Sequence, residues 1–576
     1  MPPDSGLTIA ASAAPRAATR PTDLLARGEP FLWGLGGALA FGVMMIAGFL
    51  LLVLWNGVAT FYPRPIHVVT LVNGDVIAGE PTRTEDFRPP ATEVADLPAP
   101  VRAGIETNLG FADRTLYRTG NFDLYGDDFR WVTDYAVARV TTPPDLYLFE
   151  RLEWGVFIGR IKSVDMAGVR YDAGSIPLDR LAATHDEARR RWRQIREIEH
   201  DEIGRVNQEI ESERLALRKV ELRSGARAPE YADAARRTDA RVLTLTDEYE
   251  GLAARAAALK AENARYRITL TEIGGGEKAQ NLADIVRFYP ANDLSALERL
   301  GVYFSRWGEF LTAEPREANT EGGVLPAIFG TFAMTLLMVV AVAPFGVMTA
   351  LYLREYAEQG RLVSIVRISV NNLAGVPSIV YGVFGLGFFA YILGGTIDQV
   401  FFPERLPNPT FGTGGLMWSA LTLALLTVPV VIVATEEALA AVPRSMREGS
   451  LACGASKWQT IHRIVLPRAM PGIMTGLILA MARGAGEVAP LMLVGVVKLA
   501  PELPIDGIFP YIHFERSFMH LGFHIYDVGF QSRNSEAGKP MVFVTTLLLI
   551  ALVALMNATA IVVRNRLKRK FAGSQF

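Results

Sequence analysis

Two charged side chains lie inside an otherwise apolar stretch of the chain, residues 472–497. Arg483 and Glu487 are four residues apart, so a helix would place them on one face. An arginine at the centre of a bilayer costs roughly 2.5–3.5 kcal/mol on insertion scales, so it should face a protein interior or a wetted path. Its guanidinium offers the bidentate fork that suits phosphate groups. The pair predicts an anion-binding position or, alternatively, an intrahelical salt bridge that contacts no ligand.

The carboxylate adds a second chemical possibility to this pair. Glu487 can hold Arg483 when the site is empty and repel an anion toward release. Further polar side chains, Asn371, Asn372 and Ser378, stand beside Pro377 at the start of another apolar run. They are second-rank candidates for an anion path, because helix capping or interhelical hydrogen bonds explain such residues equally well.

A polar, basic segment separates two other apolar runs. Residues 448–467, "EGSLACGASKWQTIHRIVLP", predict a polar, basic helix that is followed by a proline. Gly454 would mark a sharp turn or a close approach of another chain, and the other residues of interest in this segment are Glu448, Trp458, Ile464, Leu466 and Pro467. The alternative is an ordinary basic loop.

Composition excludes several kinds of function. The formal net charge is −2 among 576 residues, so no nucleic-acid partner is indicated. The single cysteine, Cys453, and seven scattered histidines provide no metal-ligand spacing. No G-x-x-x-x-G-K-[ST] loop occurs, so the chain is not expected to be an enzyme that hydrolyses ATP by that route. We expect no cofactor in this chain, and energy would have to come from a partner.

Apolar runs of about 20 residues, the length that crosses a bilayer core, predict six transmembrane helices. The runs are residues 31–55, 325–353, 373–393, 415–434, 472–497 and 542–563. The first is too long for a secretory signal and lacks a small-residue cleavage site, so it should stay as an anchor. Because 50% of residues are hydrophobic and 20% are charged, a large part should lie outside the membrane.

Lysine and arginine collect beside alternate ends of these runs, which predicts orientation. Basic residues precede the first run, lie between the second and third and between the fourth and fifth, and follow the sixth. Both termini should therefore be cytoplasmic. The long segment 57–323 should then face outward, away from the cytoplasm.

The outward segment has its own pattern. Alternating apolar and polar residues predict a β-rich part at 67–178. Residues 182–264 are strongly charged, with an apolar seam spaced by three and four, which predicts an antiparallel coiled-coil hairpin with arms of roughly 54 Å. Two roles stay open for it: a passive spacer or a rod that docks a partner. Residues 266–323 predict strands that return to the β part and an amphipathic helix at 294–311.

The fold class expected is thus an α-helical integral membrane protein with an inserted α+β domain. The predicted divisions are a cytoplasmic tail (1–30), a first transmembrane helix (31–56), the extracytoplasmic insertion (57–323), a core of five helices (324–565) that includes a cytoplasmic coupling loop (436–468), and a second cytoplasmic tail (566–576).

Several motifs, in order, resemble a known family. Residues 448–467 match the E-A-A, G, I-x-L-P spacing of the coupling loop of ABC importer permeases, with Gly449 and Ser450 in place of two alanines. The segments at 371–389, 409–450, 482–495 and 524–532 resemble the A-subunit permeases of phosphate-specific ABC importers, the PstA family. Arg483 and Glu487 occupy the matching "AR-x-x-GE" positions. The insertion lies outside the usual pattern.

This resemblance implies the type I ABC importer permease fold and ATP-driven import of inorganic phosphate. It implies a second, PstC-like permease, a dimer of a PstB-like ATPase, and a periplasmic PstS-like phosphate-binding protein, besides membrane lipid. Two other functions remain open: a permease for another oxyanion such as molybdate or sulfate, and a membrane signalling or scaffold protein that transports nothing. Buried charges such as Arg483 argue against a scaffold.

Overall fold

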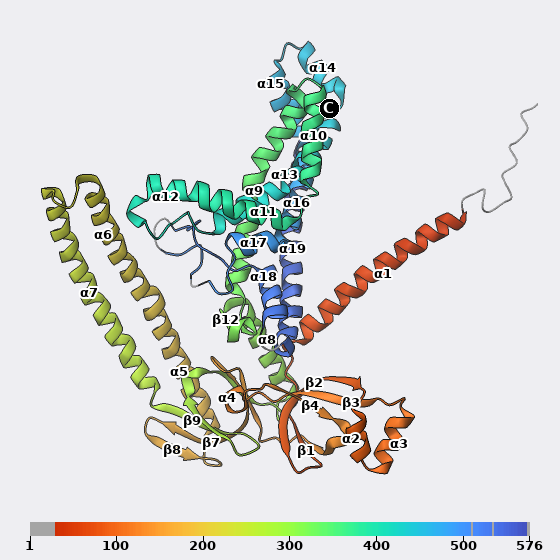
Figure 1. Ribbon diagram of the computed structural model, residues 1–576, viewed down its shortest axis with the longest axis vertical. Helices are drawn as coiled ribbons and strands as arrows, with labels where there is room; N and C mark the ends of the chain where they lie inside the picture. The colour runs from red at the N-terminus through yellow and green to blue at the C-terminus, as the bar shows by residue number, and fades with distance from the viewer. Residues whose placement is uncertain (1–28, 501, 508–510, 533–534, 573–576) are drawn as a thin grey trace, which may run out of the picture. The chain divides into compact units, whose positions relative to one another are not determined.

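The computed structural model describes residues 29–500, 502–507, 511–532 and 535–572 (Figure 1). The chain divides into two units, residues 1–56 and 57–576. The described part of the first unit belongs to helix α1 (Glu29–Ala59), which is apolar on all sides and has most of its side chains exposed. A helix without a polar face is typical of a lipid environment. The basic residues expected before it, Arg16, Arg20 and Arg27, lie outside the described residues.

Six helices in the described ranges are long and apolar enough to cross a membrane. They are Phe31–Ala59, Leu325–Tyr356, Ser378–Phe401, Leu416–Ala440, Lys457–Gly486 and Ser535–Arg569. Several boundaries differ from those expected: the fifth span begins at Lys457 instead of residue 472, the third ends at Phe401 instead of residue 393, and the sixth begins at Ser535 instead of residue 542. Two further differences come from breaks in the backbone. The third begins at Ser378, not at residue 373, because Pro377 separates it from the shorter helix α10 (Arg361–Leu373). The fifth ends at Gly486 and does not continue to residue 497.

The membrane core is built around α9 (Leu325–Leu351), α13 (Leu416–Ala440) and α16 (Leu466–Gly486). Met338, Leu423 and Ala480, one from each helix, belong to the same buried cluster. A Cβ on Gly476 of α16 would lie 2.5 Å from the Cβ of Ala434, so the backbones of α13 and α16 are in close contact. The other helices of the core are α11 (Ser378–Phe384), α12 (Gly395–Phe401), α17 (Ala489–Val494), α18 (Leu521–Tyr526) and α19 (Ser535–Ala572).

Two antiparallel sheets form the β part of the insertion. In spatial order, the first contains β4 (Phe129–Thr133), β3 (Ala112–Arg118), β2 (Val76–Phe87), β1 (His67–Leu71) and β5 (Val137–Thr141). The second contains β10 (Glu277–Asn281), β9 (Tyr266–Thr271), β7 (Val156–Met166), β6 (Tyr147–Arg151) and β11 (Ile285–Pro290), with β8 (Val169–Asp172) paired to β7. Val68, Leu148 and Ile158 share one buried cluster, so the sheets have a common core. Short helices α2 (Ala91–Asp96), α3 (Ala99–Thr107) and α4 (Phe122–Tyr125) lie in the loops.

A long helical hairpin leaves the second sheet between β8 and β9. Its first arm consists of α5 (Leu178–Arg196) and α6 (Ile203–Ser224), joined by a π-helical turn, and its second arm is α7 (Pro229–Asn263). Figure 1 shows α6 and α7 side by side, and ion pairs such as Arg241 to Glu209, 2.9 Å, join the two arms. Near the tip, Lys219 Nζ lies 3.5 Å from Glu404 Oε1, in the loop after α12. The tip thus contacts the membrane core.

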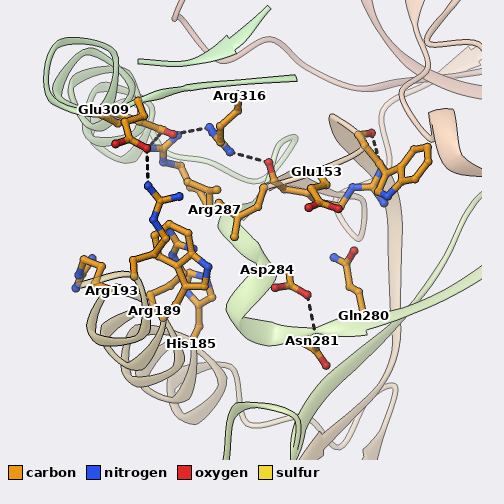
Figure 2. Close-up of a pocket in the computed structure, with 18 of the residues that line it drawn as sticks. Glu153, His185, Arg189, Arg193, Gln280, Asn281, Asp284, Arg287, Glu309 and Arg316 are labelled. Atoms are coloured by element: carbon orange, nitrogen blue, oxygen red, sulfur yellow. Dashed lines mark hydrogen bonds and ion pairs between the residues drawn. The ribbon is translucent and has the colours of Figure 1, made fainter. Parts of the chain in front are cut away.

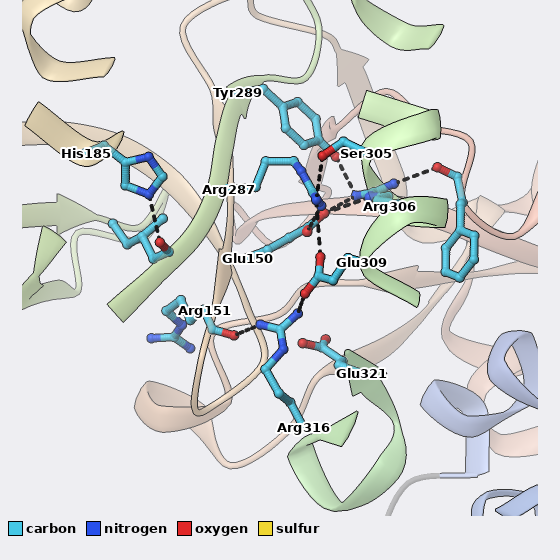
Figure 3. A network of polar contacts seen from close by, with 12 residues as sticks. Glu150, Arg151, His185, Arg287, Tyr289, Ser305, Arg306, Glu309, Arg316 and Glu321 are labelled. Carbon is cyan, nitrogen blue, oxygen red and sulfur yellow. Dashed lines mark hydrogen bonds and ion pairs between the residues drawn. The ribbon is translucent and has the colours of Figure 1, made fainter. Parts of the chain in front are cut away.

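A buried polar network joins the second sheet to α8 (Ala296–Thr312), as Figure 3 shows. Arg306 of α8 lies 2.6 Å from Glu150 of β6, and Arg287 of β11 pairs with both Glu150 and Glu309. Burial would raise the pKa of Glu150, but the charges of Arg306 and Arg287 hold it below its usual value. After α8 the chain passes through a small hairpin, β12 (Pro315–Arg316) and β13 (Glu321–Gly322), into α9. The network therefore fixes the insertion to the element that enters the core.

Candidate functional site

Arg483 lies in the last turn of α16, where the unpaired carbonyl groups at the end of a helix favour a positive charge. Its Nε is 3.6 Å from Glu487 Oε1. The two side chains are 38% and 22% exposed, so the pair is neither sealed in the interior nor fully open. One expectation needs correction: Glu487 is not on the same helix face, because α16 ends at Gly486 and Glu487 has an extended backbone.

The break after Gly486 changes the environment of the pair. A short helix, α17, follows, and its Pro490 lies against α11, where a Cβ on Gly382 would be 2.7 Å from the Pro490 Cα. Discontinuous helices inside membrane proteins leave backbone groups free, and such backbone is tolerated only where protein covers it or where it lines a cavity. Substrate sites of membrane transporters are commonly built at such breaks. Gly486 and Pro490, close together in sequence, are the signal from which the break could have been predicted.

The second-rank residues do not join this pair in the described structure. Asn371 and Asn372 are exposed in the last turn of α10, so they do not begin the third span as expected. Ser378 is the first residue of α11, the helix that packs against α17. Within the described ranges, no hydrogen bond or ion pair links any of the three to Arg483 or Glu487.

The polar segment between the fourth and fifth spans forms a compact helical unit. It comprises α14 (Arg444–Ala452) and α15 (Lys457–Thr460), separated by Gly454, whose φ of +83° favours glycine. Ser456 caps α15 and exchanges hydrogen bonds with Gln459. From the sequence we expected either a sharp turn or a close approach of a partner at Gly454. The structure shows the turn.

One face of this unit is free in the structure of the single chain. Glu448, Gly454 and Trp458 are exposed, and Leu451 beside them is 50% exposed. Ile464, Leu466 and Pro467 are half-buried and continue into α16. A groove of about 400 Å³ runs between α14 and the start of α16, lined by residues that include Met446 and Arg463. Exposed apolar side chains on an otherwise polar loop are typical of a docking surface.

Two ion pairs that the sequence did not reveal join elements at this end of the core, and one of them holds α14. Arg447 of α14 lies 2.9 Å from Glu355 and also donates hydrogen bonds to carbonyl oxygens at the end of α13. Arg367 of α10 lies 3.1 Å from Glu436 of α13. A movement imposed on α14 would therefore be transmitted to α13 and to the end of the second span. The only sequence signal for these pairs is the placement of arginines beside apolar runs. Arginines at such positions are also expected from the positive-inside rule, so their placement alone does not predict an ion pair.

The described residues contain no group of three or more histidine, cysteine, aspartate or glutamate side chains that could hold a metal ion. The candidate site is therefore one intramembrane ion pair at a helix break, with an exposed helical unit at one end of the helices.

Comparison with known proteins places residues 342–569 in a family model described as binding-protein-dependent transport system inner membrane component. The phosphate transport system permease protein PstA 1 of Mycobacterium tuberculosis H37Rv is 37% identical over 244 residues, which is 42% of this chain and 70% of that protein. The probable ABC transporter permease protein YqgH of Bacillus subtilis is 36% identical over 204 residues, 34% of this chain and 62% of its own length.

Another relative and one solved structure complete the comparison. The phosphate transport system permease protein PstA of Mycobacterium leprae is 40% identical over 175 residues, 30% of this chain and 52% of that protein. A structure of the MetNI methionine ABC transporter in an inward-facing conformation aligns with a TM-score of 0.33 and 20% identity, covering 42% of this chain and 95% of that one. The matches to YqgH and the leprosy-bacillus PstA span between half and two thirds of those relatives.

Proposed function

Because the chain belongs to the PstA family of phosphate transport system permeases, we propose that it is the membrane-spanning permease subunit of an ATP-driven ABC importer of inorganic phosphate. The observation that carries this proposal is the 37% identity over 244 residues, which covers 71% of a PstA 1 protein. The family model matches residues 342–569, a range that includes Arg483. Phosphate moves from the periplasm to the cytoplasm through the bundle.

Arg483 is the anion-binding group of the path in this proposal. Its guanidinium binds two phosphate oxygens in the bidentate manner that a lysine ammonium does not reproduce. In the structure it lies 3.6 Å from Glu487, a distance at which the two charges attract without a short hydrogen bond. Glu487 therefore competes with the anion for Arg483, which prevents tight trapping and favours release. Asn371, Asn372 and Ser378 remain proposed contributors further along the path.

The exposed unit of α14 and α15 is the proposed coupling loop, and a separate PstB-like ATPase dimer is its partner. Trp458 and Leu451 supply apolar contact, Gly454 forms the turn between the two helices, and Ser456 caps α15. Closure of the ATPases would push α14, and the pair formed by Arg447 and Glu355 would pass that movement to the spans. This chain would use no cofactor, since ATP and magnesium belong to the ATPase.

The remaining partners and the topology follow from the same proposal. A PstC-like permease completes the path, and a PstS-like protein delivers phosphate from the periplasm. The chain lies in the bacterial inner membrane with both termini in the cytoplasm and residues 57–323 in the periplasm. Figure 1 supports opposite sides for the coupling loop and the insertion, because α14 and α15 lie at one end of the core helices and α8 lies at the other.

Transport by a reconstituted complex tests the proposal. The chain is purified with its ATPase and second permease, placed in vesicles, and supplied with the binding protein. We expect phosphate to stimulate ATP hydrolysis and to accumulate, while molybdate and sulfate do neither. If only molybdate or sulfate stimulated ATP hydrolysis, that anion and not phosphate would be the substrate. Normal phosphate uptake in cells that lack this chain would remove the transport function and favour a signalling or scaffold role.

A further inference from the structure

The insertion contains a cavity that phosphate transport does not require. It has a volume of about 1250 Å³ and lies between α5, the end of β10, the start of β11 and the last turn of α8. Figure 2 shows Arg189 and Arg193 projecting from α5, Gln280 and Asp284 on the strand segment, and Glu309 and Arg316 at the upper edge of the view. The walls thus come from the hairpin, the sheet and the helix that leads to α9.

Positive charge dominates the lining. Nine of the lining side chains are arginine or lysine and five are aspartate or glutamate. Most of the acids already have partners: Glu309 pairs with Arg287 and Arg316, and Glu314 lies 2.5 Å from Arg196. Lining histidine His185 adds no charge, because burial lowers its pKa and its Nε2 is 2.7 Å from the Ile285 carbonyl oxygen.

The arginines of α5 lack such partners. Within the described residues, no carboxylate lies within ion-pair distance of Arg189 or Arg193. Arg189 donates a hydrogen bond of 3.0 Å to the Ala283 carbonyl and lies over the ring of Trp192. Burial, with the charges of Arg316 and Arg193, lowers its pKa to about 10. A half-buried guanidinium in a positive field is stabilised when an anion binds.

Other features of the cavity indicate a built site. Gln280 lines it, and its Nε2 donor is buried without a hydrogen-bond partner. Trp154 also lines it and has a φ of +70°, a strained conformation for a bulky residue. Arg151, 2% exposed and paired with Asp123, holds that strained turn through hydrogen bonds to the Trp154 and Gly155 carbonyls.

We propose that this cavity binds an anion that carries two or more phosphate groups, with Arg189 and Arg193 as its principal ligands. Arg189 and Arg193 are four residues apart on α5, so their guanidinium groups extend from one helix face. The volume exceeds the roughly 300–1,000 Å³ of ordinary small-molecule pockets, so a single phosphate would leave most of it empty. Gln280 supplies a donor from the strand segment, whereas Lys278 beside it is already paired with Asp123 at 2.9 Å.

Two sources of this chemistry are tested separately. The α8 end of the cavity, at Glu309 and Thr312, is close in sequence to the start of the second span at Leu325, so a diphosphate lipid headgroup is one source and a soluble oligophosphate the other. The full chain is placed in nanodiscs of neutral phosphatidylcholine, with or without cardiolipin, and titrated with tripolyphosphate by calorimetry. The titration is repeated in an Arg483→Ala background, which removes the proposed transport ligand.

Four variants make the measurement specific. We expect saturable tripolyphosphate binding that persists in Arg483→Ala and weakens about ten- to hundredfold in Arg193→Gln, the loss expected for a hydrogen bond to a charged group. Arg189→Gln should weaken it similarly. Arg193 is exposed, so its variant should fold normally. Arg236→Gln with Arg237→Gln, on α7 and outside the cavity, removes the same kind of charge and should leave affinity unchanged.

The remaining outcomes decide the source or overturn the inference. The site belongs to the lipid headgroup if two results are obtained. Tripolyphosphate binds only in discs without cardiolipin, and cardiolipin is retained by the wild-type chain but not by Arg193→Gln. Equal tripolyphosphate affinity in the Arg193→Gln and control variants would show that general surface charge, not the cavity, attracts the anion. Absence of both tripolyphosphate binding and cardiolipin retention would overturn the proposal.

Discussion

A single guanidinium carries the substrate chemistry of the proposed path, so its replacement is the sharpest test at the residue scale. Arg483→Ala should abolish phosphate uptake, because the proposed anion ligand is lost. In the described structure no other cation pairs with Glu487 and could take over that position. Arg483→Lys should restore little, since an ammonium is a point charge without the bidentate fork. Uptake of radiolabelled phosphate, with membrane amounts of the chain matched by immunoblot, measures both. Normal uptake by the alanine variant would leave the arginine with a structural role.

Glu150 permits a prediction of pH dependence. Its pKa is held below the ordinary value of 4.5 by Arg306 and Arg287 despite burial, so the folded state keeps the carboxylate charged where the unfolded chain binds a proton. The resulting stability is present above about pH 4.5 and is lost as the pH falls further. Thermal unfolding of the full chain in detergent should show this loss.

The Glu150→Gln variant tests the cause. At neutral pH it should be less stable by about 3–5 kcal/mol, because Arg306 is left buried beside an uncharged group. Its stability should then depend less on pH below 4.5 than that of the wild type. Glu106→Gln, an exposed glutamate on α3, is the matched control and should change neither. If the stability of the Glu150→Gln variant fell with pH as that of the wild type does, the network around Glu150 would not be the cause of the loss in acid.

At the scale of the element, composition and charge predicted a great deal because they depend on many residues at once. Six apolar helices were expected and the described residues contain six, since a bilayer requires a long apolar run whatever its neighbours are. The break at Glu487 was missed because hydropathy continues through α17, and only Gly486 and Pro490 mark it. The start of the third span was also predicted wrongly, because the apolar run begins before Pro377 whereas the helix begins after it. The ion pairs of Arg447 and Arg367 depend on tertiary packing, which no local pattern encodes.

The turn between α14 and α15 carries the prediction at this scale. Gly454→Leu forces a branched residue into a φ of +83°, which costs about 1–3 kcal/mol, although no atom lies within 4 Å of the added Cβ. The chain should therefore still assemble, while the altered turn displaces Trp458 from its partner. We expect ATP hydrolysis by the complex that no longer drives uptake. Gly449→Leu, a glycine of α14 with equally open surroundings, is the control.

The Gly454→Leu and Gly449→Leu variants can also contradict the docking prediction. Wild-type coupling in Gly454→Leu, measured as phosphate accumulated per ATP hydrolysed, would exclude this turn from the docking contact. Loss of coupling in Gly449→Leu as well would show that bulk on α14, rather than the geometry of the turn, is what the partner excludes.

At the scale of the whole molecule, the side of the membrane that holds the insertion is the first question. The hairpin turn at Gly225 is exposed and joins two long arms, which makes it accessible to protease. Protease added to spheroplasts should cut there and leave the core intact. Protection in spheroplasts, with cleavage only after the inner membrane is opened, would reverse the proposed topology.

The contact between hairpin and core is the second question, because neither role left open by the sequence, a passive spacer or a rod that docks a partner, requires the hairpin to touch the core. The structure instead places Lys219 Nζ 3.5 Å from Glu404 Oε1, and Glu404 is 8% exposed with its Oε2 lacking any other partner in the described residues. A nearly buried carboxylate is costly without a cation, so Lys219 is the group that makes this position tolerable. The hairpin is thereby fixed at both ends.

A proximity measurement decides whether that contact exists in the membrane. In a Cys453→Ser background, which removes the single cysteine, Lys219→Cys and Glu404→Cys should be joined within one chain by a short bis-maleimide. Arg236→Cys with Glu404→Cys is the control, because Arg236 lies on the other arm and is largely exposed. Equal cross-linking of both pairs would indicate a mobile hairpin. Absence of cross-linking in the first pair, with both cysteines reactive to a monovalent maleimide, would mean that the tip stands clear of the core and is available to a periplasmic partner.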